Sequence, residues 1–220
     1  MDTIYGMARL TNVFTAVAAL RAIDKGKLSL YKTVASYLPE FAANGKSNIT
    51  VLVLLTHTCG FAPDPLPGLY EALYKTMQQR VRAIIIVSNV PGSTYIYSDL
   101  NFMNLRFLLE KVTKTPFEES DHSFTRNLGM ASTFFNKGNN QSPSFYHYTR
   151  MAPTENQIDV MGDAEPKPPQ SVRGTVHDEN AWVGTGRVTI LFGRRYAIGL
   201  PTRLAGMFPF HDALVGRYFV

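Results

Sequence analysis

The sequence predicts an α+β protein that is mainly helical, and three observations support this class. Apolar residues recur at intervals of three and four in residues 11–27 and 98–114, the spacing of helices with one buried face. Two short apolar runs flank a glycine-containing turn in residues 188–200, which predicts a β-hairpin. The 220 residues, 45% of them hydrophobic, are enough for one sizeable core, so a single domain is the simplest expectation.

Glycine, proline and capping signals divide the first half of the chain into helices and loops. We expect a first helix at 11–27, ended by Gly26, and then a loop at 28–41 with a short helical turn stopped by Pro39. A second helix starts at 48–50 and buries 51–55, and a surface loop follows at 63–68. A third helix is expected at 69–89, although its β-branched run at 84–87 also suits an extended strand.

The second half shows the same kinds of signal and then turns polar. After a turn at 90–93, we expect a helix that is capped by Ser98 or Asp99 and runs to about Lys114. Its inward residues are Leu100, Met103, Phe107, Leu108 and Val112. A helix at 117–128 ended by Gly129, a long irregular loop at 134–173, and the hairpin of 188–192 and 196–200 follow.

Composition narrows the kinds of partner and cofactor. The net charge of +5 is mild for this length and no run of five like charges occurs, so a solvated surface is favoured over nucleic-acid or anionic-membrane binding. The single cysteine, Cys59, excludes an internal disulfide and a cysteine-only zinc site. Because the histidines show no metal-ligand spacing, we expect no metal and no cofactor.

The sequence predicts neither a leader nor a membrane span. The first residues lack a basic segment followed by a long apolar one, which argues against a signal peptide. No stretch reaches the roughly 18 apolar residues that cross a bilayer, and the densest run, at 81–90, is too short. We therefore expect a soluble protein, cytoplasmic by default.

Several blocks along the chain match the motifs of one enzyme superfamily in their order and spacing. Residues 2–20 are similar to D-T-x-F-x-x-A-S-x-T-K-x-F-T-A-x-A-x-L, and residues 97–102 to Y-S-[ND]-x-x-[YF]. The chain thus resembles the serine β-lactamase and penicillin-binding-protein superfamily, in the esterase-like branch related to class C β-lactamases. The other matching blocks are Asp24–Leu30, Ile49–Phe61, Pro91–Gly92, and the short segments at 128–130, 152–155 and 176–181.

The resemblance implies a β-lactamase/transpeptidase-like fold of which this chain has mainly the helical portion. Relatives place strands before the first helix and near the C-terminus in one antiparallel sheet, which we expect to be incomplete or absent here. The motif match stops after Trp182. We therefore expect a partial β-lactamase-related domain at 1–182 and a divergent tail at 183–220 that holds the hairpin. Helices without their sheet expose an apolar face, which favours self-association.

The resemblance also places the family's catalytic positions on this sequence. The family needs a serine at a helix N-terminus, where backbone N–H groups stabilise the oxyanion, and a lysine one turn later on the same face. A tyrosine relays protons, and a K-T-G or H-x-G strand supplies a further cation. Arg9 stands at the serine position, Asn12 at the lysine position and Tyr97 at the relay; the resemblance further implies substrate contacts by Asp99 and His177.

The substitutions at Arg9 and Asn12 remove the groups on which the family's chemistry depends. A guanidinium stays protonated and has no nucleophilic atom, and an amide takes no proton at neutral pH. The chain contains no Lys-Thr-Gly, and Gly-Thr-Gly at 184–186 lacks the cation. Loss of nucleophile and base together typically lowers the rate by about 10⁶-fold. Arg9 could instead lower the pKa of Tyr97 or clamp a ligand carboxylate.

Two other residue pairs invite a catalytic interpretation. Ser29 and Lys32 match S-x-x-K literally, but they fall in the predicted loop after the first helix, so coincidence is favoured. His57 and Cys59 suggest a thiol–imidazole pair. Residues two apart do not face each other on a helix, so a packing role is favoured for both.

Three functions remain open from the sequence. The favoured one is a β-lactamase-related serine hydrolase or transesterase family protein that is catalytically impaired and binds a small acyl, ester or amide ligand or has lost its function. The second is an active acyl hydrolase or acyltransferase that uses a non-standard nucleophile. The third is a non-catalytic interaction module that exposes an apolar helical face to a partner or to another copy.

Overall fold

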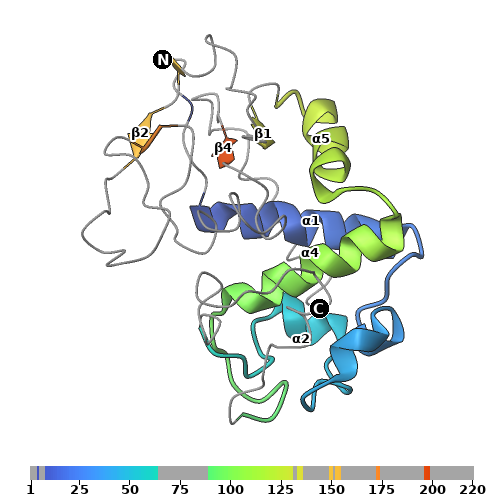
Figure 1. The fold of residues 1–220 in the computed structure, drawn as a ribbon. Helices are drawn as coiled ribbons and strands as arrows, with labels where there is room; N and C mark the ends of the chain where they lie inside the picture. The colour runs from blue at the N-terminus through green and yellow to red at the C-terminus, as the bar shows by residue number, and fades with distance from the viewer. Residues whose placement is uncertain are drawn as a thin grey trace.

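Helices form the centre of the molecule. In the computed structural model α1 (Thr11–Asp24) packs against α4 (Asp99–Thr113), and α4 packs against the short α2 (Val51–Leu55). Figure 1 shows α1 and α4 across the middle, with α2 on one side of them and α5 (Phe117–Asn127) on the other. The residues that the structure describes are 4, 8–63, 89–130, 133–135, 149–150, 152–154, 172–173 and 196–198.

The first predicted helix is confirmed as α1. A 3₁₀ turn, η1 (Ala8–Leu10), precedes it, and the Lys25 N–H closes it by bonding the Arg21 carbonyl at 3.2 Å. Gly26 follows with φ of 67°, a left-handed conformation that glycine adopts without a Cβ clash. The face turned inward consists of Thr11, Phe14, Thr15, Ala18, Ala19 and Ala22.

Two 3₁₀ turns, η2 (Val34–Ser36) and η3 (Pro39–Ala42), lead from α1 to α2. The predicted helical turn before Pro39 is η2, which ends at Ser36, and a second turn that was not expected, η3, begins at Pro39 itself. At the first position of a helical turn the missing N–H of proline is no loss, and its fixed φ fits. The predicted start of α2 is confirmed, since the Thr50 hydroxyl accepts a hydrogen bond from the Val53 N–H at 3.4 Å.

The longest helix, α4, is the one around which the core is built. Its predicted cap is confirmed: the Ser98 hydroxyl accepts a hydrogen bond from the Leu100 N–H at 3.3 Å. The helix ends at Thr113, and Lys114 is left-handed with φ of 56°. Burial extends around the helix beyond the predicted apolar stripe, because polar side chains are buried as well. Its buried residues are Leu100, Asn101, Phe102, Met103, Asn104, Leu105, Arg106, Phe107, Leu108 and Leu109, whereas Val112 is partly buried.

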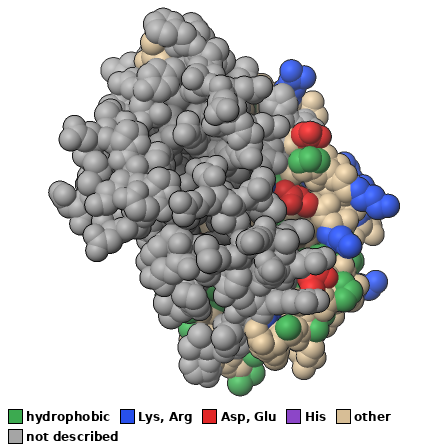
Figure 2. Space-filling view, in the orientation of Figure 1, with side chains coloured by type: hydrophobic (Ala, Val, Ile, Leu, Met, Phe, Trp, Pro, Cys, Tyr) green, Lys and Arg blue, Asp and Glu red, His purple; other side chains and the backbone are tan. Residues whose placement is uncertain are grey.

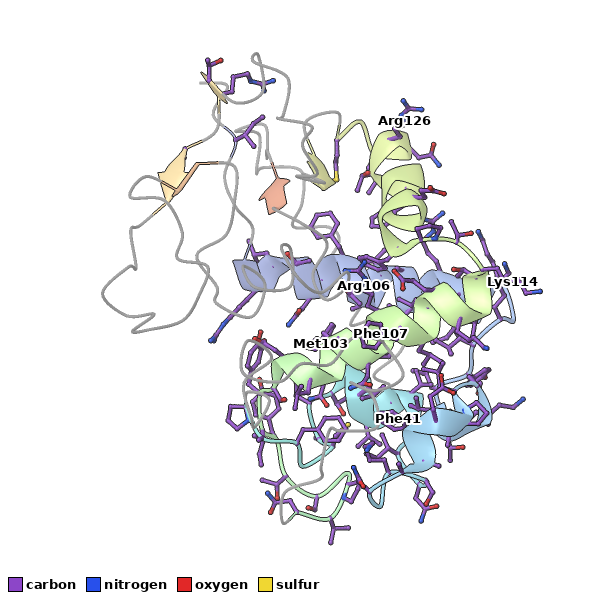
Figure 3. All side chains as sticks on the ribbon, in the orientation of Figure 1. Phe41, Met103, Arg106, Phe107, Lys114 and Arg126 are labelled. Atoms are coloured by element: carbon purple, nitrogen blue, oxygen red, sulfur yellow. The ribbon has the colours of Figure 1, made fainter. Side chains whose placement is uncertain are left out.

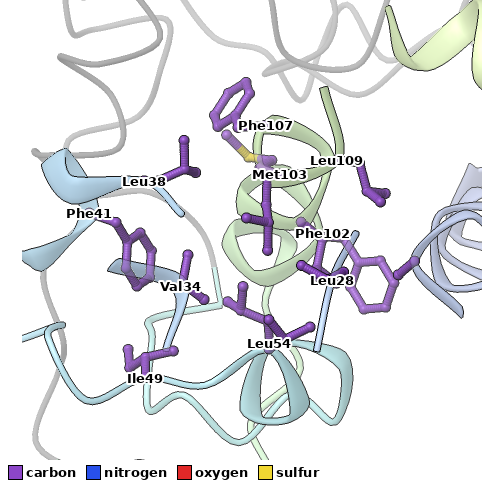
Figure 4. Close-up of a cluster of buried hydrophobic side chains, with 14 of the residues drawn as sticks. Leu28, Val34, Leu38, Phe41, Ile49, Leu54, Phe102, Met103, Phe107 and Leu109 are labelled. Atoms are coloured by element: carbon purple, nitrogen blue, oxygen red, sulfur yellow. The ribbon is translucent and has the colours of Figure 1, made fainter. Parts of the chain in front are cut away.

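The main core lies between α4, α2, the 3₁₀ turns and α1. Phe41 and Phe61 meet edge to face with ring centroids 6.5 Å apart. Figure 3 shows Met103 and Phe107 on α4, and Phe41, which belongs to η3, below that helix. Figure 4 shows the apolar side chains that meet there, among them Leu28, Val34, Leu38, Phe41, Ile49, Leu54, Phe102, Met103, Phe107 and Leu109.

A smaller apolar cluster joins α1 to α5. Phe14 and Phe124 have ring centroids 6.1 Å apart, and the Arg21 guanidinium carbon lies 5.1 Å from the Phe124 centroid. The predicted end of α5 is confirmed by Gly129, which has φ of 70°. The Glu110 carboxylate accepts hydrogen bonds from Arg106 Nε at 3.1 Å and from the Phe117 N–H at 3.2 Å, which ties α4 to the start of α5.

Short strands lie beside the helices. The strand β1 (Thr133–Phe135) pairs antiparallel with β4 (Tyr196–Ile198), and β2 (Pro153–Thr154) pairs antiparallel with β3 (Val172–Arg173). The expected loop at 134–173 therefore contains strand segments, a correction that follows from pairing with distant parts of the chain. The second arm of the expected hairpin contains β4, but its described partner is β1; the first arm, at 188–192, lies outside the described residues.

Figure 2 shows the described surface on one face, where basic side chains alternate with acidic and apolar ones. Among the described helices, none combines the length and hydropathy that a bilayer span requires. The expected helix at 69–89 lies outside the described residues except for Asn89, as does all but the first position of the expected loop at 63–68.

Candidate active site

Two loop segments run side by side, and the second of them carries the predicted relay tyrosine, Tyr97. Residues 57–63 follow α2, and residues 89–98 lead into α4. Because both segments are tied to helices of the core and to each other, Tyr97 has a fixed position. The backbone hydrogen bonds that join them run from the Gly92 N–H to Thr58 O at 2.7 Å, from the Ile96 N–H to His57 O at 2.8 Å, and from the Asp99 N–H to Pro63 O at 3.2 Å.

Gly60 brings the backbone of the first segment close to Asn89 of the second. It has φ of 76°, and a Cβ added there would lie 2.7 Å from the Asn89 carbonyl oxygen. Real Cβ atoms do not come so close to backbone, and a side chain is strained at this φ. The glycine of the H-T-C-G stretch is therefore a steric requirement of the loop pair.

The start of α1 brings Arg9 and Asn12 onto Tyr97. The Asn12 amide donates a hydrogen bond from Nδ2 to the Tyr97 hydroxyl at 3.0 Å. The Arg9 guanidinium carbon lies 4.7 Å from the centroid of the same ring, within cation–π distance. The structure thus brings together the three positions that the motifs assign to nucleophile, base and relay, while their catalytic roles stay predictions.

The surroundings of Tyr97 favour the neutral phenol. Burial is the largest influence and raises the pKa of Tyr97; the negative charge of Asp99 and its hydrogen bond with the phenol raise it further. The Arg9 charge and the Asn12 hydrogen bond act in the opposite direction. The lowering that we expected from Arg9 is therefore present but outweighed, and Tyr97 is not held as a phenolate.

Neither of the other candidate pairs is arranged for nucleophilic catalysis. Ser29 and Lys32 lie in non-helical chain between α1 and η2, so their spacing does not place them on one helix face. Cys59 is fully buried, and burial raises the pKa of its thiol, which disfavours the reactive thiolate. The packing interpretation of Cys59 is thus favoured by the structure.

Two of the predicted site features cannot be placed. His177 and the Gly-Thr-Gly at 184–186 lie outside the described residues, so their roles stay predictions. Asp99 is placed at the first position of α4, beside Tyr97. Within the described part of the chain, no group of His, Cys, Asp and Glu is arranged to hold a metal ion.

The structure adds His57 to the site, where the motifs suggested only packing. Its ring lies against Tyr97 with centroids 4.5 Å apart, and its Nδ1 accepts hydrogen bonds from the Ser98 N–H at 3.2 Å and from Asn101 Nδ2 at 2.9 Å. Its partners are some 40 positions away in sequence, so no local spacing could reveal them. The residue type is the one local signal, and it indicates only the turn after α2: His57 has φ of 54°, and histidine is among the few residues other than glycine that are enriched at positive φ.

The comparisons with known proteins assign the helical scaffold that carries the cluster around Tyr97 to a class. The family model described as Beta-lactamase matches residues 1–210, nearly the whole chain. The chain therefore belongs to the Beta-lactamase family and is related to its serine hydrolases. The match runs beyond the last motif that we identified in the sequence, and the expected boundary at residue 182 stays a prediction.

Curated relatives and solved structures agree with this assignment. The chain is 28% identical over 207 residues to a Salmonella agona (strain SL483) protein named "Putative D-alanyl-D-alanine carboxypeptidase", covering 86% of this chain and 46% of that protein. It thus spans about half the length of the curated relatives it matches. A protein from Salmonella typhimurium with the same name shows the same identity and coverage.

Two solved structures show the likeness of the fold. The Beta-Lactamase/D-Alanine Carboxypeptidase from Pseudomonas syringae superposes with a TM-score of 0.66 at 21% identity, covering 98% of this chain and 52% of that one. The D-stereospecific amidohydrolase from a Streptomyces species superposes with a TM-score of 0.54 at 25% identity, covering 69% of this chain and 48% of that one. The β-lactamase/transpeptidase-like fold is therefore shown.

Proposed function

We propose that this chain is a catalytically impaired member of the Beta-lactamase family that binds a small acyl, ester or amide ligand at the Arg9–Asn12–Tyr97 cluster without forming an acyl-enzyme. The observation that carries the proposal is the double contact of Tyr97 with an arginine and an asparagine, where the family chemistry needs a serine and a lysine. This arrangement supports a site in which the family's positions are occupied by side chains with other chemistry.

The chemistry of these side chains supports the loss of turnover. A guanidinium offers donors but no electron pair for attack on a carbonyl, and an amide cannot act as a base at neutral pH. Tyr97 accepts a hydrogen bond from Asn12 and keeps its proton, so no described group of the cluster is an activated nucleophile. What the cluster retains is a set of hydrogen-bond donors that suits the carbonyl or carboxylate oxygen of a ligand.

The neighbouring surface supports ligand binding rather than burial of the cluster. Arg9 is exposed, and the apolar side chains of Leu10 and Val13 beside it are 54% and 47% exposed. A cation next to apolar surface suits a ligand with an acidic or carbonyl end and an apolar body. The same apolar positions are the described part of the helical face through which we predict self-association, and size-exclusion chromatography tests that expectation separately.

The proposal includes the architecture. We propose that the chain retains mainly the helical portion of the fold with an incomplete sheet, divided into a partial domain at 1–182 and a divergent tail. Supporting this, the described strands form two-stranded pairs of two or three residues each. Because the chain spans about half of its relatives, any activity of a longer protein is part of the proposal and not of the findings.

A covalent serine-hydrolase probe with peptide mass mapping tests the loss of nucleophile. We expect no specific adduct on the wild-type chain at probe concentrations that label an active family enzyme completely. The matched variant R9S/N12K returns the family's two groups to the same positions, and we expect an adduct on its peptide that contains residue 9. A stoichiometric adduct on any serine of the wild-type chain would show an active hydrolase with a non-standard nucleophile and would overturn the proposal.

A further inference from the structure

His57 joins the end of α2 to the segment that carries Tyr97. It follows the helix with φ of 54°, and its N–H bonds the Leu54 carbonyl at 3.3 Å. Its own carbonyl accepts the Ile96 N–H at 2.8 Å. The backbone of this one residue therefore connects a core helix to the residue directly before Tyr97.

The imidazole of His57 adds a second connection on the other side of Tyr97. Its ring lies between two aromatic rings, with centroids 4.5 Å from Tyr97 and 4.9 Å from Phe102. Its Nδ1 faces two donors, the Ser98 N–H and the side-chain amide of Asn101. His57 thus contacts Ile96 and Ser98, the residues before and after Tyr97, and its ring covers one face of the Tyr97 ring.

We propose that His57 is a positioning residue whose neutral imidazole holds the Tyr97 phenol against Asn12 and Arg9. The inference rests on the proposed function in so far as Tyr97 belongs to the ligand site. His57 acts through its contacts with Tyr97 and Ser98, because its Nδ1 faces the Ser98 N–H and the Asn101 amide, and the residue is only 8% exposed.

The proposal requires Nδ1 without a proton, and the surroundings favour that state. Among the described residues, the titratable and charged groups around the ring are the phenols of Tyr95 and Tyr97, with Arg9 on the Tyr97 ring and Asp99 bonded to its phenol. Burial is the main influence on His57 and lowers its pKa below the ordinary 6.5, while a hydrogen bond with the Ser98 backbone acts the other way. At neutral pH the imidazole is therefore uncharged.

Protonation would exchange partners within this network. A proton on Nδ1 repels the donors that face it and needs an acceptor. Within the described part of the chain the buried Oδ1 of Asn101 has no hydrogen-bond partner, so a half-turn of that amide would turn Oδ1 toward Nδ1 as the acceptor. The Ser98 N–H would then lose its partner, and Tyr97 would lose part of its support. Acid should therefore loosen Tyr97 at a pH set by His57.

Two substitutions separate the two roles of the imidazole, which are the ring contact with Tyr97 and the acceptor Nδ1. His57→Asn keeps an acceptor near the Nδ1 position and tolerates a positive φ, but it removes the ring. His57→Phe keeps an aromatic ring but removes the acceptor. The phenol of Tyr97 is followed by tyrosinate absorbance on the ligand-free chain, with Tyr97→Phe subtracted to isolate its signal, and circular dichroism verifies that each variant is folded.

We expect His57→Phe to lower the pKa of Tyr97 toward its ordinary value, because the phenol becomes more exposed to water. His57→Asn should retain most of the raised pKa. An unchanged Tyr97 pKa in a folded His57→Phe variant would overturn the proposal.

A second measurement needs no substitution and remains available if His57→Phe does not fold. In the wild-type chain labelled with ¹³C-tyrosine, the Tyr97 resonance should shift as the pH falls through the pKa of His57, below 6.5. The shift should be absent in His57→Asn. A Tyr97 resonance that does not respond to acid would overturn the proposal. Because both readouts use ligand-free protein, labelling by the covalent probe could refute the proposed function and leave this result intact.

Discussion

The core between α2 and α4 and the cluster around Tyr97 differ in what each requires of its residues. The core is filled by fully buried apolar side chains such as Leu54, Leu105 and Phe107, and any set of similar volume would serve there. The cluster has its three side chains in contact, yet Arg9 and Asn12 lack the groups that the family's reaction needs. Packing and chemistry are thus separate constraints, because the scaffold of a family can be retained whatever chemistry its site residues support.

The largest effect should come from the core. Phe107→Ala removes a fully buried ring of α4, and we expect the free energy of unfolding to fall by about 3–5 kcal/mol, because the cavity cannot refill. Urea denaturation followed by circular dichroism measures the change. Leu128→Ala, at a side chain that is 49% exposed, is the control and should change stability little. Equal losses in the two variants would show that α4 is not the centre of the core.

A medium effect should come from the loop pair that connects the two regions. Gly60→Ala places a methyl group 2.7 Å from the Asn89 carbonyl and strains the backbone at φ of 76°, and we expect a loss of about 1–3 kcal/mol. Gly92→Ala is matched to it, since Gly92 has φ of 88° but open space around the added methyl group. Thermal unfolding of both variants separates clash from strain. Equal losses of stability in the two variants would show that the close approach at Gly60 adds nothing to the backbone strain.

The smallest effect should come from the cluster itself. Arg9→Ala should cost about 0.5–1 kcal/mol or less, because the guanidinium is exposed, but it should raise the pKa of Tyr97 further, since the Arg9 charge lowers it. Arg21→Ala removes a similar cation–π contact of α1, on Phe124, and should leave the Tyr97 titration unchanged. A spectrophotometric titration compares them. A shift of equal size in both variants would mean that Arg9 acts through general charge and not through contact.

The sequence predicted the helices better than the strands, for physical reasons. Helix ends depend on neighbours in the chain, so the hydroxyl of Ser98 and the positive φ of Gly129 could be expected from local signals alone. The strand β4 pairs with β1, more than sixty positions earlier, and no local pattern encodes such a partner. The turn η3 was not expected because proline, which stops one helical turn, can also begin the next.

The site divides in the same way. Arg9, Asn12 and Tyr97 could be grouped only through the family's motif order, because 85 positions separate Asn12 from Tyr97. His57 was interpreted by its spacing to Cys59, which is uninformative because both residues follow the helix rather than lie on it. Its contacts with Ser98 and Asn101 arise from the approach of two loops, which only the three-dimensional structure supplies.

The joined loops also give Tyr97 a position that does not depend on one element alone. The bond from the Asp99 N–H to Pro63 O and the close approach of Gly60 to Asn89 hold the two segments together on the scaffold. Since the first segment follows α2 and the second leads into α4, a change in the packing of either helix should be transmitted to Tyr97. The phenol of Tyr97 is therefore also a reporter of how α2 and α4 are packed.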